Sequence, residues 1–136
     1  MHENEVARQI VDAAYKIHST LGPGLLESAY QAILVYELQR RGLQIEAETQ
    51  MPVVYEGIRL DIGYRADLIV EDKVIVELKS VEQIAPVHKK QLLTYLRLAD
   101  KRLGLLINFG APLIKDGIIR IVNRLEEEPT QSRQER

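Results

Sequence analysis

Two short apolar runs lie in the middle of the chain and are separated only by a polar turn. Residues 65–70 and 74–76 are rich in β-branched and aliphatic side chains, which is typical of strands buried on both faces of a sheet. Asp67 interrupts the first run, and Glu77 and Lys79 end the second. Because ionised groups beside a buried strand need a partner or a bound cation, this segment requires a covered sheet and marks a candidate site.

The length of the turn decides whether the charged residues meet. Side chains two residues apart in a strand point to the same face, so Glu77 and Lys79 project together. A three-residue loop over 71–73 places Asp67 directly opposite Glu77, whereas a two-residue loop would put the two carboxylates on opposite faces. We predict the three-residue loop or an equivalent bulge.

The three charged residues are of the types that metal-assisted hydrolysis uses. Two neighbouring carboxylates repel each other unless a divalent cation lies between them, and hard oxygen ligands favour Mg²⁺ or Mn²⁺. The chain has no cysteine, which excludes thiolate metal sites, disulfides and thiol nucleophiles. Lys79 is placed to orient or help deprotonate a bound water and to stabilise an anionic transition state. The alternative is a cross-strand salt bridge without chemistry.

The rest of the chain alternates between helical and strand periodicity around this segment. Helices are predicted over 5–20, with Asn4 as N-cap, over 25–41 and over 86–100. Strands are predicted over 43–55, with an edge or bulge at Pro52, and over 58–62, 65–70, 74–79, 103–109 and 117–122. We expect an α/β fold with one mixed central sheet flanked by helices, forming a single domain over 1–124 with a frayed polar tail over 125–136.

Composition agrees with a soluble globular protein. The chain of 136 residues and 15.5 kDa has 46% hydrophobic and 28% charged residues, close to the averages of such domains. No apolar run approaches the roughly 18 residues of a membrane span, so we expect a cytoplasmic protein without membrane contact. The net charge of -2 does not by itself favour nucleic acid.

The helix predicted over 86–100 differs in charge from the chain as a whole. Residues 86–102 hold five cations against the single acid Asp100, a local balance of +4. Such a surface beside the candidate site fits nucleic acid, and it also fits an ordinary solvated face. The cations are Lys89, Lys90, Arg97, Lys101 and Arg102, and the same helix carries a polar face of His88, Gln91 and Tyr95.

A second polar cluster opens the helix predicted over 25–41. Glu27 and Tyr30 are three residues apart and share a face that differs from the apolar stripe of Leu26 and Ile33. Glu27 is equally explained by the favourable interaction of a first-turn acid with the helix dipole. The spacing alone therefore leaves the role of this cluster open.

In their order along the chain, these clusters resemble the motifs of a known family. Gly24, Glu27 and Tyr30 match the Gly-x-x-Glu-x-x-Tyr signature of the GxxExxY family, and the resemblance runs from about residue 5 to residue 123. Ala66 stands before the aspartate, where the superfamily often has proline. The later residues look like motifs of the wider PD-(D/E)XK nuclease superfamily, in its RecB-like and lambda-exonuclease-like branches: Asp67, Glu77, Lys79, Gln91 and Tyr95.

The resemblance implies a restriction-endonuclease-like α-β-β-β-α-β core and metal-dependent hydrolysis of phosphodiester bonds in DNA. By position, Lys79 becomes the catalytic lysine, and Gln91 and Tyr95 hold Lys79 or a backbone phosphate. The implied metal ligands are Asp67, Glu77, the Leu78 backbone carbonyl and Glu27, the last directly or through water. The expected nucleic-acid contacts are Tyr30, His88, Lys89, Lys90 and Arg97.

One histidine is a further candidate ligand. Some RecB-like relatives use an N-terminal histidine to bind metal, and His18 is the candidate for that ligand in this chain. A packed or capping histidine is the alternative, because Mg²⁺ disfavours imidazole.

We expect a nuclease that depends on Mg²⁺ or Mn²⁺ and acts on DNA, with RNA left open. A domain of this size without a separate sequence-reading motif is expected to work as a homodimer or in a larger complex. Two other functions stay open: a catalytically silent or partner-dependent accessory module that binds nucleic acid, and a phosphohydrolase for small nucleotides.

Overall fold

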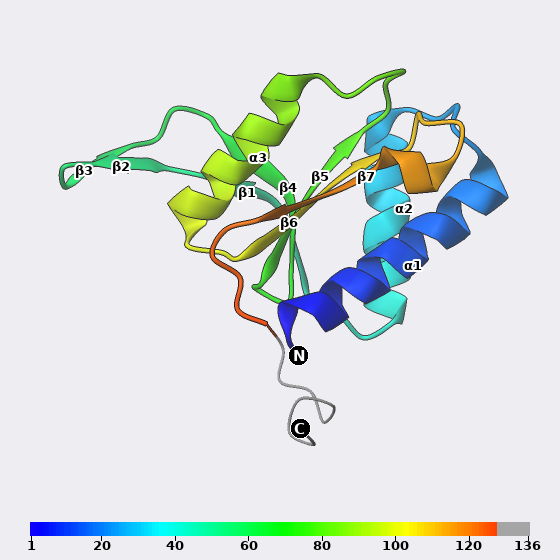
Figure 1. Cartoon of the computed structure of the whole chain (residues 1–136), viewed down its shortest axis with the longest axis horizontal. Coiled ribbons are helices and arrows are strands. Elements are labelled where there is room, and N and C mark those ends of the chain that lie inside the picture. The colour runs from blue at the N-terminus through cyan, green and yellow to red at the C-terminus, as the bar shows by residue number, and fades with distance from the viewer. Residues whose placement is uncertain (128–136) are drawn as a thin grey trace.

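Five strands form one mixed sheet with helices on both faces in the computed structural model, which describes residues 1–127 (Figure 1). The strand order is β1-β4-β5-β6-β7, and all neighbouring pairs are antiparallel except β5 and β6. The parallel pair is joined by the crossover helix α3, Pro86–Ala99. The strands are β1 Ile45–Gln50, β4 Arg65–Val70, β5 Val74–Lys79, β6 Leu103–Asn108 and β7 Ile118–Val122.

The two faces of the sheet are covered by different helices. Helices α1, Glu3–Leu21, and α2, Glu27–Arg40, pack on the face that carries Leu68, Val76 and Leu78. Helix α3 packs on the other face, against Ile75 and Leu106. Because strand side chains alternate, the odd-numbered residues of β5 face α3, and the expected α/β fold with flanking helices is confirmed.

The strand predicted over 43–55 is divided at Pro52. Its second part, β2 Val53–Tyr55, pairs with β3 Ile58–Leu60 in a separate two-stranded hairpin. Glu56 and Gly57 close this hairpin with φ angles of 49° and 80°, the left-handed backbone that a tight two-residue turn needs. Figure 1 shows the hairpin projecting beyond the main sheet.

Two details of the helix predictions are wrong. The N-cap of α1 is His2, whose Nδ1 accepts a hydrogen bond of 2.9 Å from the N–H of Asn4, so Asn4 already lies inside the helix. In α2, Leu26 is 76% exposed because the helix begins after it, at Glu27. The buried stripe of α2 therefore follows Tyr30, Leu34 and Leu38, with the predicted Ile33 partly buried against the core, and Leu26 does not belong to it.

The predicted polar tail begins with residues that contact the domain. Leu125 packs against the core, and the Glu126 carbonyl accepts a hydrogen bond of 3.1 Å from His2 Nε2. Residues 128–136, the remainder of that tail, lie outside the described part of the chain. Within residues 1–127, no helix is long and apolar enough to cross a membrane.

Candidate active site

The turn between β4 and β5 has the predicted length. Residues 71–73 form the loop, and Val70 pairs with Val74 across it. Continued along the strands, this register places Asp67 opposite Glu77, both on the α3 side of the sheet. The three-residue loop is confirmed, and with it the shared face of the two carboxylates.

Each carboxylate of this pair is held by the backbone of the opposite strand. Glu77 Oε2 accepts a hydrogen bond of 2.8 Å from the N–H of Asp67, and Asp67 Oδ2 accepts one of 2.8 Å from the N–H of Leu78. The regular strand pairing ends just before this point, at Leu68 and Val76. The carboxylates thus replace ladder bonds where the strands separate, which fixes both side chains in place.

Burial and mutual repulsion change the acidity of the pair. The low polarity around Glu77 and, second, the negative charge of Asp67 raise the pKa of Glu77 to about 8, while the charge of Lys79 opposes the rise. Near neutral pH the site therefore resists holding two negative charges by itself. A bound cation would remove that resistance.

The donor set fits a magnesium-like ion only in part. Two carboxylates and the neighbouring Leu78 carbonyl are hard oxygen donors, and Mg²⁺ commonly takes one or two carboxylates and fills its other positions with water or phosphate. However, no three Asp, Glu or His side chains gather into a metal-binding group anywhere in residues 1–127. The expected participation of Glu27 as a direct ligand is therefore not seen.

Lys79 lies beside the carboxylates without being paired to them. It follows Glu77 on the same face of β5, and its charge lowers the pKa of Glu77. Within the described chain, no ion pair joins Lys79 to Asp67 or Glu77 at 4.0 Å or less. The simple salt-bridge alternative is thus not the observed arrangement, and the ammonium group of Lys79 is available to another anion.

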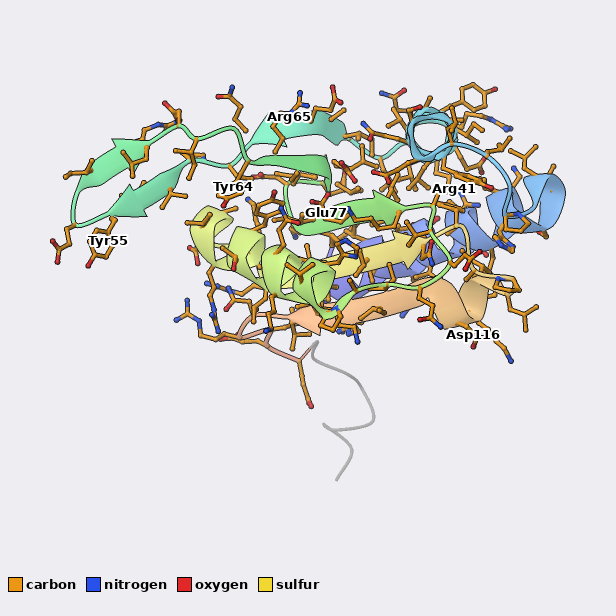
Figure 2. The ribbon with its side chains drawn as sticks, turned by 90° about the horizontal axis from the view of Figure 1, so that it is seen from above. Arg41, Tyr55, Tyr64, Arg65, Glu77 and Asp116 are labelled. Carbon is orange, nitrogen blue, oxygen red and sulfur yellow. The ribbon has the colours of Figure 1, made fainter. Side chains whose placement is uncertain are left out.

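Two residues of α3 close over the pair. Gln91 Nε2 donates a hydrogen bond of 2.8 Å to the Tyr95 hydroxyl, which confirms that the two side chains share a face. Burial and then the negative charge of Glu77 raise the pKa of Tyr95, so this hydroxyl lies near the carboxylates. Its ring contacts that of Tyr64, with centroids 6.1 Å apart, and Figure 2 shows Glu77 and Tyr64 on the side of the sheet near α3.

Tyr30 is a core residue, so its prediction as a nucleic-acid contact is wrong. Its side chain is fully buried and stacks on Phe109, with centroids 4.4 Å apart and planes 5° apart. Its hydroxyl donates to the Gly22 carbonyl and accepts a hydrogen bond of 3.1 Å from the N–H of Leu25. Tyr30 therefore holds the turn that leads into α2.

That turn also contacts the end of β5. Ser80 Oγ, directly after the candidate lysine, donates a hydrogen bond of 2.7 Å to the Leu25 carbonyl. The first turn of α2, including the exposed Glu27, is thereby kept at the edge of the sheet where β5 ends. The GxxExxY-like segment thus lies at the same end of the sheet as the carboxylate pair, although Glu27 does not complete a three-carboxylate cluster.

The cationic helix is less basic in the folded protein than its sequence indicates. Lys101 pairs with Asp72 at 2.8 Å, and Arg102 pairs with Asp100 at 3.0 Å. Asp72 comes from the turn between β4 and β5, which a count over residues 86–102 omits. The exposed cations of the helix that form no ion pair within residues 1–127 are Lys89, Lys90 and Arg97.

Both histidines singled out from the sequence have structural partners. His88 Nδ1 accepts a hydrogen bond of 3.2 Å from the N–H of Ala85 and so caps the start of α3. His18 is buried and its Nε2 donates a hydrogen bond of 2.8 Å to the Ala111 carbonyl. His18 is therefore a packed core residue and not a metal ligand in this structure.

Sequence reasoning missed Asn108, which fixes the segment after Lys79. Asn108 pairs with Lys79 in the parallel ladder, and its side chain is buried. Its Oδ1 accepts hydrogen bonds of 3.0 Å from the N–H groups of Val81 and Gly110, and its Nδ2 donates one of 2.8 Å to the Val81 carbonyl. A polar residue at the end of an otherwise apolar strand was the available signal.

Comparison with known proteins identifies a family for this chain. The family model of the PD-(D/E)XK nuclease superfamily matches residues 4–121, which is most of the chain. No curated protein and no solved structure matches.

Proposed function

The chain belongs to the PD-(D/E)XK nuclease superfamily, and we propose that it is a metal-dependent nuclease that hydrolyses phosphodiester bonds of DNA. The observation that carries the proposal is the half-buried pair of Asp67 and Glu77 beside Lys79, which forms no ion pair within residues 1–127. The Gly24, Glu27 and Tyr30 spacing further supports placement in the GxxExxY branch.

Asp67, Glu77 and the Leu78 carbonyl would hold Mg²⁺ or Mn²⁺. When bound, such an ion supplies an activated water and neutralises charge on the phosphate. The backbone hydrogen bonds to both carboxylates keep them oriented before substrate arrives, so little reorganisation is needed.

Lys79 supplies the positive charge that the chain itself brings to the phosphate. Because no carboxylate within residues 1–127 pairs with it, its ammonium group can bond to a non-bridging phosphate oxygen as negative charge develops there. Gln91 and Tyr95 form a hydrogen-bonded unit over the same face and would position the backbone phosphate or the lysine.

Binding of DNA is assigned to the exposed cations of α3. Lys89, Lys90 and Arg97 project from the helix that covers the site, and they would contact phosphates without reading base sequence. Affinity should therefore fall steeply with salt.

The small number of carboxylates at the site supports a second candidate function. Since no more than two carboxylates gather within residues 1–127, this second function is an accessory module that binds nucleic acid and whose metal affinity depends on substrate or a partner. In that case the isolated protein would bind DNA without cutting it.

The test is cleavage of linear single- and double-stranded DNA, and of RNA, with Mg²⁺ or Mn²⁺. Wild type should cut DNA, and Lys79→Ala and Asp67→Asn should not, whereas the matched exposed variants Lys115→Ala and Asp116→Asn should cut like wild type. Cleavage that persists in both site variants would overturn the assigned site. Salt-sensitive DNA binding without cleavage by wild type would favour the accessory function.

A further inference from the structure

The β2–β3 hairpin exposes an apolar face that nothing in the described chain covers. Cross-strand pairing puts Tyr55 beside Ile58, and alternation adds Leu60, the last residue of β3, to the same face. The exposed apolar side chain of Ile62 follows two residues later. These side chains are between 46% and 67% exposed, in a hairpin that projects beyond the main sheet (Figures 1 and 2). Because a lone two-stranded hairpin is marginally stable in water, this one is expected to gain from a further strand.

Only one edge of the hairpin is suited to receive that strand. The edge of β2 is preceded by Pro52, which has no N–H to donate. On the other side, the two-residue turn makes Tyr55 and Ile58 a hydrogen-bonded pair, so by alternation the N–H and C=O groups of Arg59 point outward. Asp61 directly follows the end of β3 at Leu60 and would continue this edge when a second strand pairs with it. The free edge is therefore the one that runs through Arg59 and Asp61.

The sequence along this edge is complementary to itself. Residues 58–62 have the sequence Ile-Arg-Leu-Asp-Ile. In it, apolar residues alternate with one cation and one anion that lie symmetrically on either side of Leu60. If two copies pair antiparallel about Leu60, Arg59 of each copy lies opposite Asp61 of the other. The same register places Ile58 of one copy opposite Ile62 of the other. It also lets the outward N–H and C=O groups of the two edges bond to each other.

We infer that the chain forms a twofold symmetric homodimer through antiparallel pairing of β3 with β3 of a second copy. The pairing joins two hairpins into a four-stranded sheet with one continuous apolar face. It is independent of the nuclease chemistry, because none of its residues belongs to the carboxylate site.

The charges of the hairpin favour a second copy over nucleic acid. Glu56 and Asp61 outweigh Arg59, so the hairpin is net acidic and would repel phosphates. Charged side chains on an edge strand usually oppose its pairing with a second copy. Here Arg59 and Asp61 have opposite charges and pair at 3.3 Å within one copy, so in the proposed register they exchange partners across the twofold axis without setting like charges opposite each other.

Charge reversal at this edge tests the inference directly. Molar mass should be measured by light scattering over a range of protein concentrations. Wild type should be dimeric, and both Arg59→Asp and Asp61→Arg should weaken the dimer at least about tenfold, because each sets like charges opposite one another. Lys115→Asp, a reversal on an exposed residue elsewhere, is the matched control and should leave the dimer intact.

Mixing the two variants gives the decisive result. In the proposed register, a copy with Arg59→Asp faces a copy with Asp61→Arg through two attractive pairs, so the mixture should form a one-to-one heterodimer. The double variant Arg59→Asp/Asp61→Arg should also recover the homodimer. Recovery in either case cannot come from a folding defect.

Three outcomes would overturn the inference. A wild type that stays monomeric to about 100 µM has no such interface of useful strength. A dimer that survives both reversals uses another surface. Loss of DNA binding in the reversal variants without any change in mass would make the hairpin a nucleic-acid contact instead.

Discussion

Two hairpins of this chain carry charges among apolar side chains, and only one of them is buried. In the β4–β5 hairpin, Asp67 and Glu77 lie beneath α3, and backbone N–H groups bond to both carboxylates at 2.8 Å. In the β2–β3 hairpin, Arg59 and Asp61 pair at 3.3 Å with side chains 63% and 61% exposed. The charge content is similar, and the surroundings differ.

The difference teaches that burial, rather than charge, makes the candidate site. Water screens the exposed pair, so its ion pair contributes little to stability. The half-buried carboxylates lose part of that solvation, and the pKa of Glu77 rises to about 8. Holding the two carboxylates close together costs folding free energy. A bound cation relieves that repulsion, so the folded site favours cation binding.

The two hairpins should differ most in the folding free energy that a change of turn length costs. Deleting Asp72 from the turn over 71–73 shifts the register by one residue and sends one strand's side chains to the wrong face, which should cost several kcal/mol of folding free energy. Inserting one glycine after Gly57 in the exposed hairpin should cost less than about 1 kcal/mol. Urea denaturation measures both, and equal costs would contradict the comparison.

Removing the unpaired cation should affect activity rather than folding. Lys79→Ala should lower the rate of DNA cleavage at least about 100-fold, because it removes a charge that acts on the transition state. The urea midpoint should stay near that of wild type, since Lys79 makes no ion pair within residues 1–127. Lys115→Ala is the control, and a comparable loss of rate in it would contradict the assignment.

The pH dependence of stability should identify the half-buried carboxyl of Glu77. A folded pKa of about 8 against an ordinary value of 4.5 means that the folded state binds more protons between these pH values, so stability falls as pH rises through this window. The loss without metal should be roughly 2 kcal/mol or more.

Denaturation at several pH values with and without Mn²⁺ measures this slope. Glu77→Gln should flatten it, and Mn²⁺ should stabilise wild type at the upper end of the window but not this variant. Glu56→Gln in the exposed hairpin should leave the slope unchanged. The same slope in Glu77→Gln and wild type would refute the role of burial.

The smallest effect is expected at the exposed ion pair. Arg59→Ala should change the folding free energy of the monomer by no more than about 0.5 kcal/mol, because a solvated pair contributes little. Denaturation at low protein concentration, where the monomer dominates, measures this. A loss above about 1 kcal/mol would show that the exposed pair is not merely solvated.

Local rules were sufficient for the segment that defines the fold. The β-branched runs at 65–70 and 74–79 and the polar turn between them specify a buried hairpin, and alternation then places Asp67, Glu77 and Lys79 on one face. Pro86 correctly marks the start of α3. These features depend on neighbours in sequence, which is why they could be predicted.

The remaining features depend on contacts between distant residues. Helical spacing grouped Tyr30 with Glu27, but the ring of Phe109 draws Tyr30 into the core. Counting charges over residues 86–102 alone treats Lys101 as unpaired, but in the folded chain Asp72 lies beside it and forms an ion pair. Neither partner can be recognised from local spacing.

The sequence by itself determined which residues could form the site and on which face they lie, because strand periodicity and turn length act over a few residues. Only the tertiary structure decided that Glu77 is half-buried on the α3 side of the sheet, that Lys79 forms no ion pair within residues 1–127, and that Asn108 anchors the segment after it. The physical reason is that solvation and pairing depend on which distant elements cover a side chain, and periodicity carries no information about that cover.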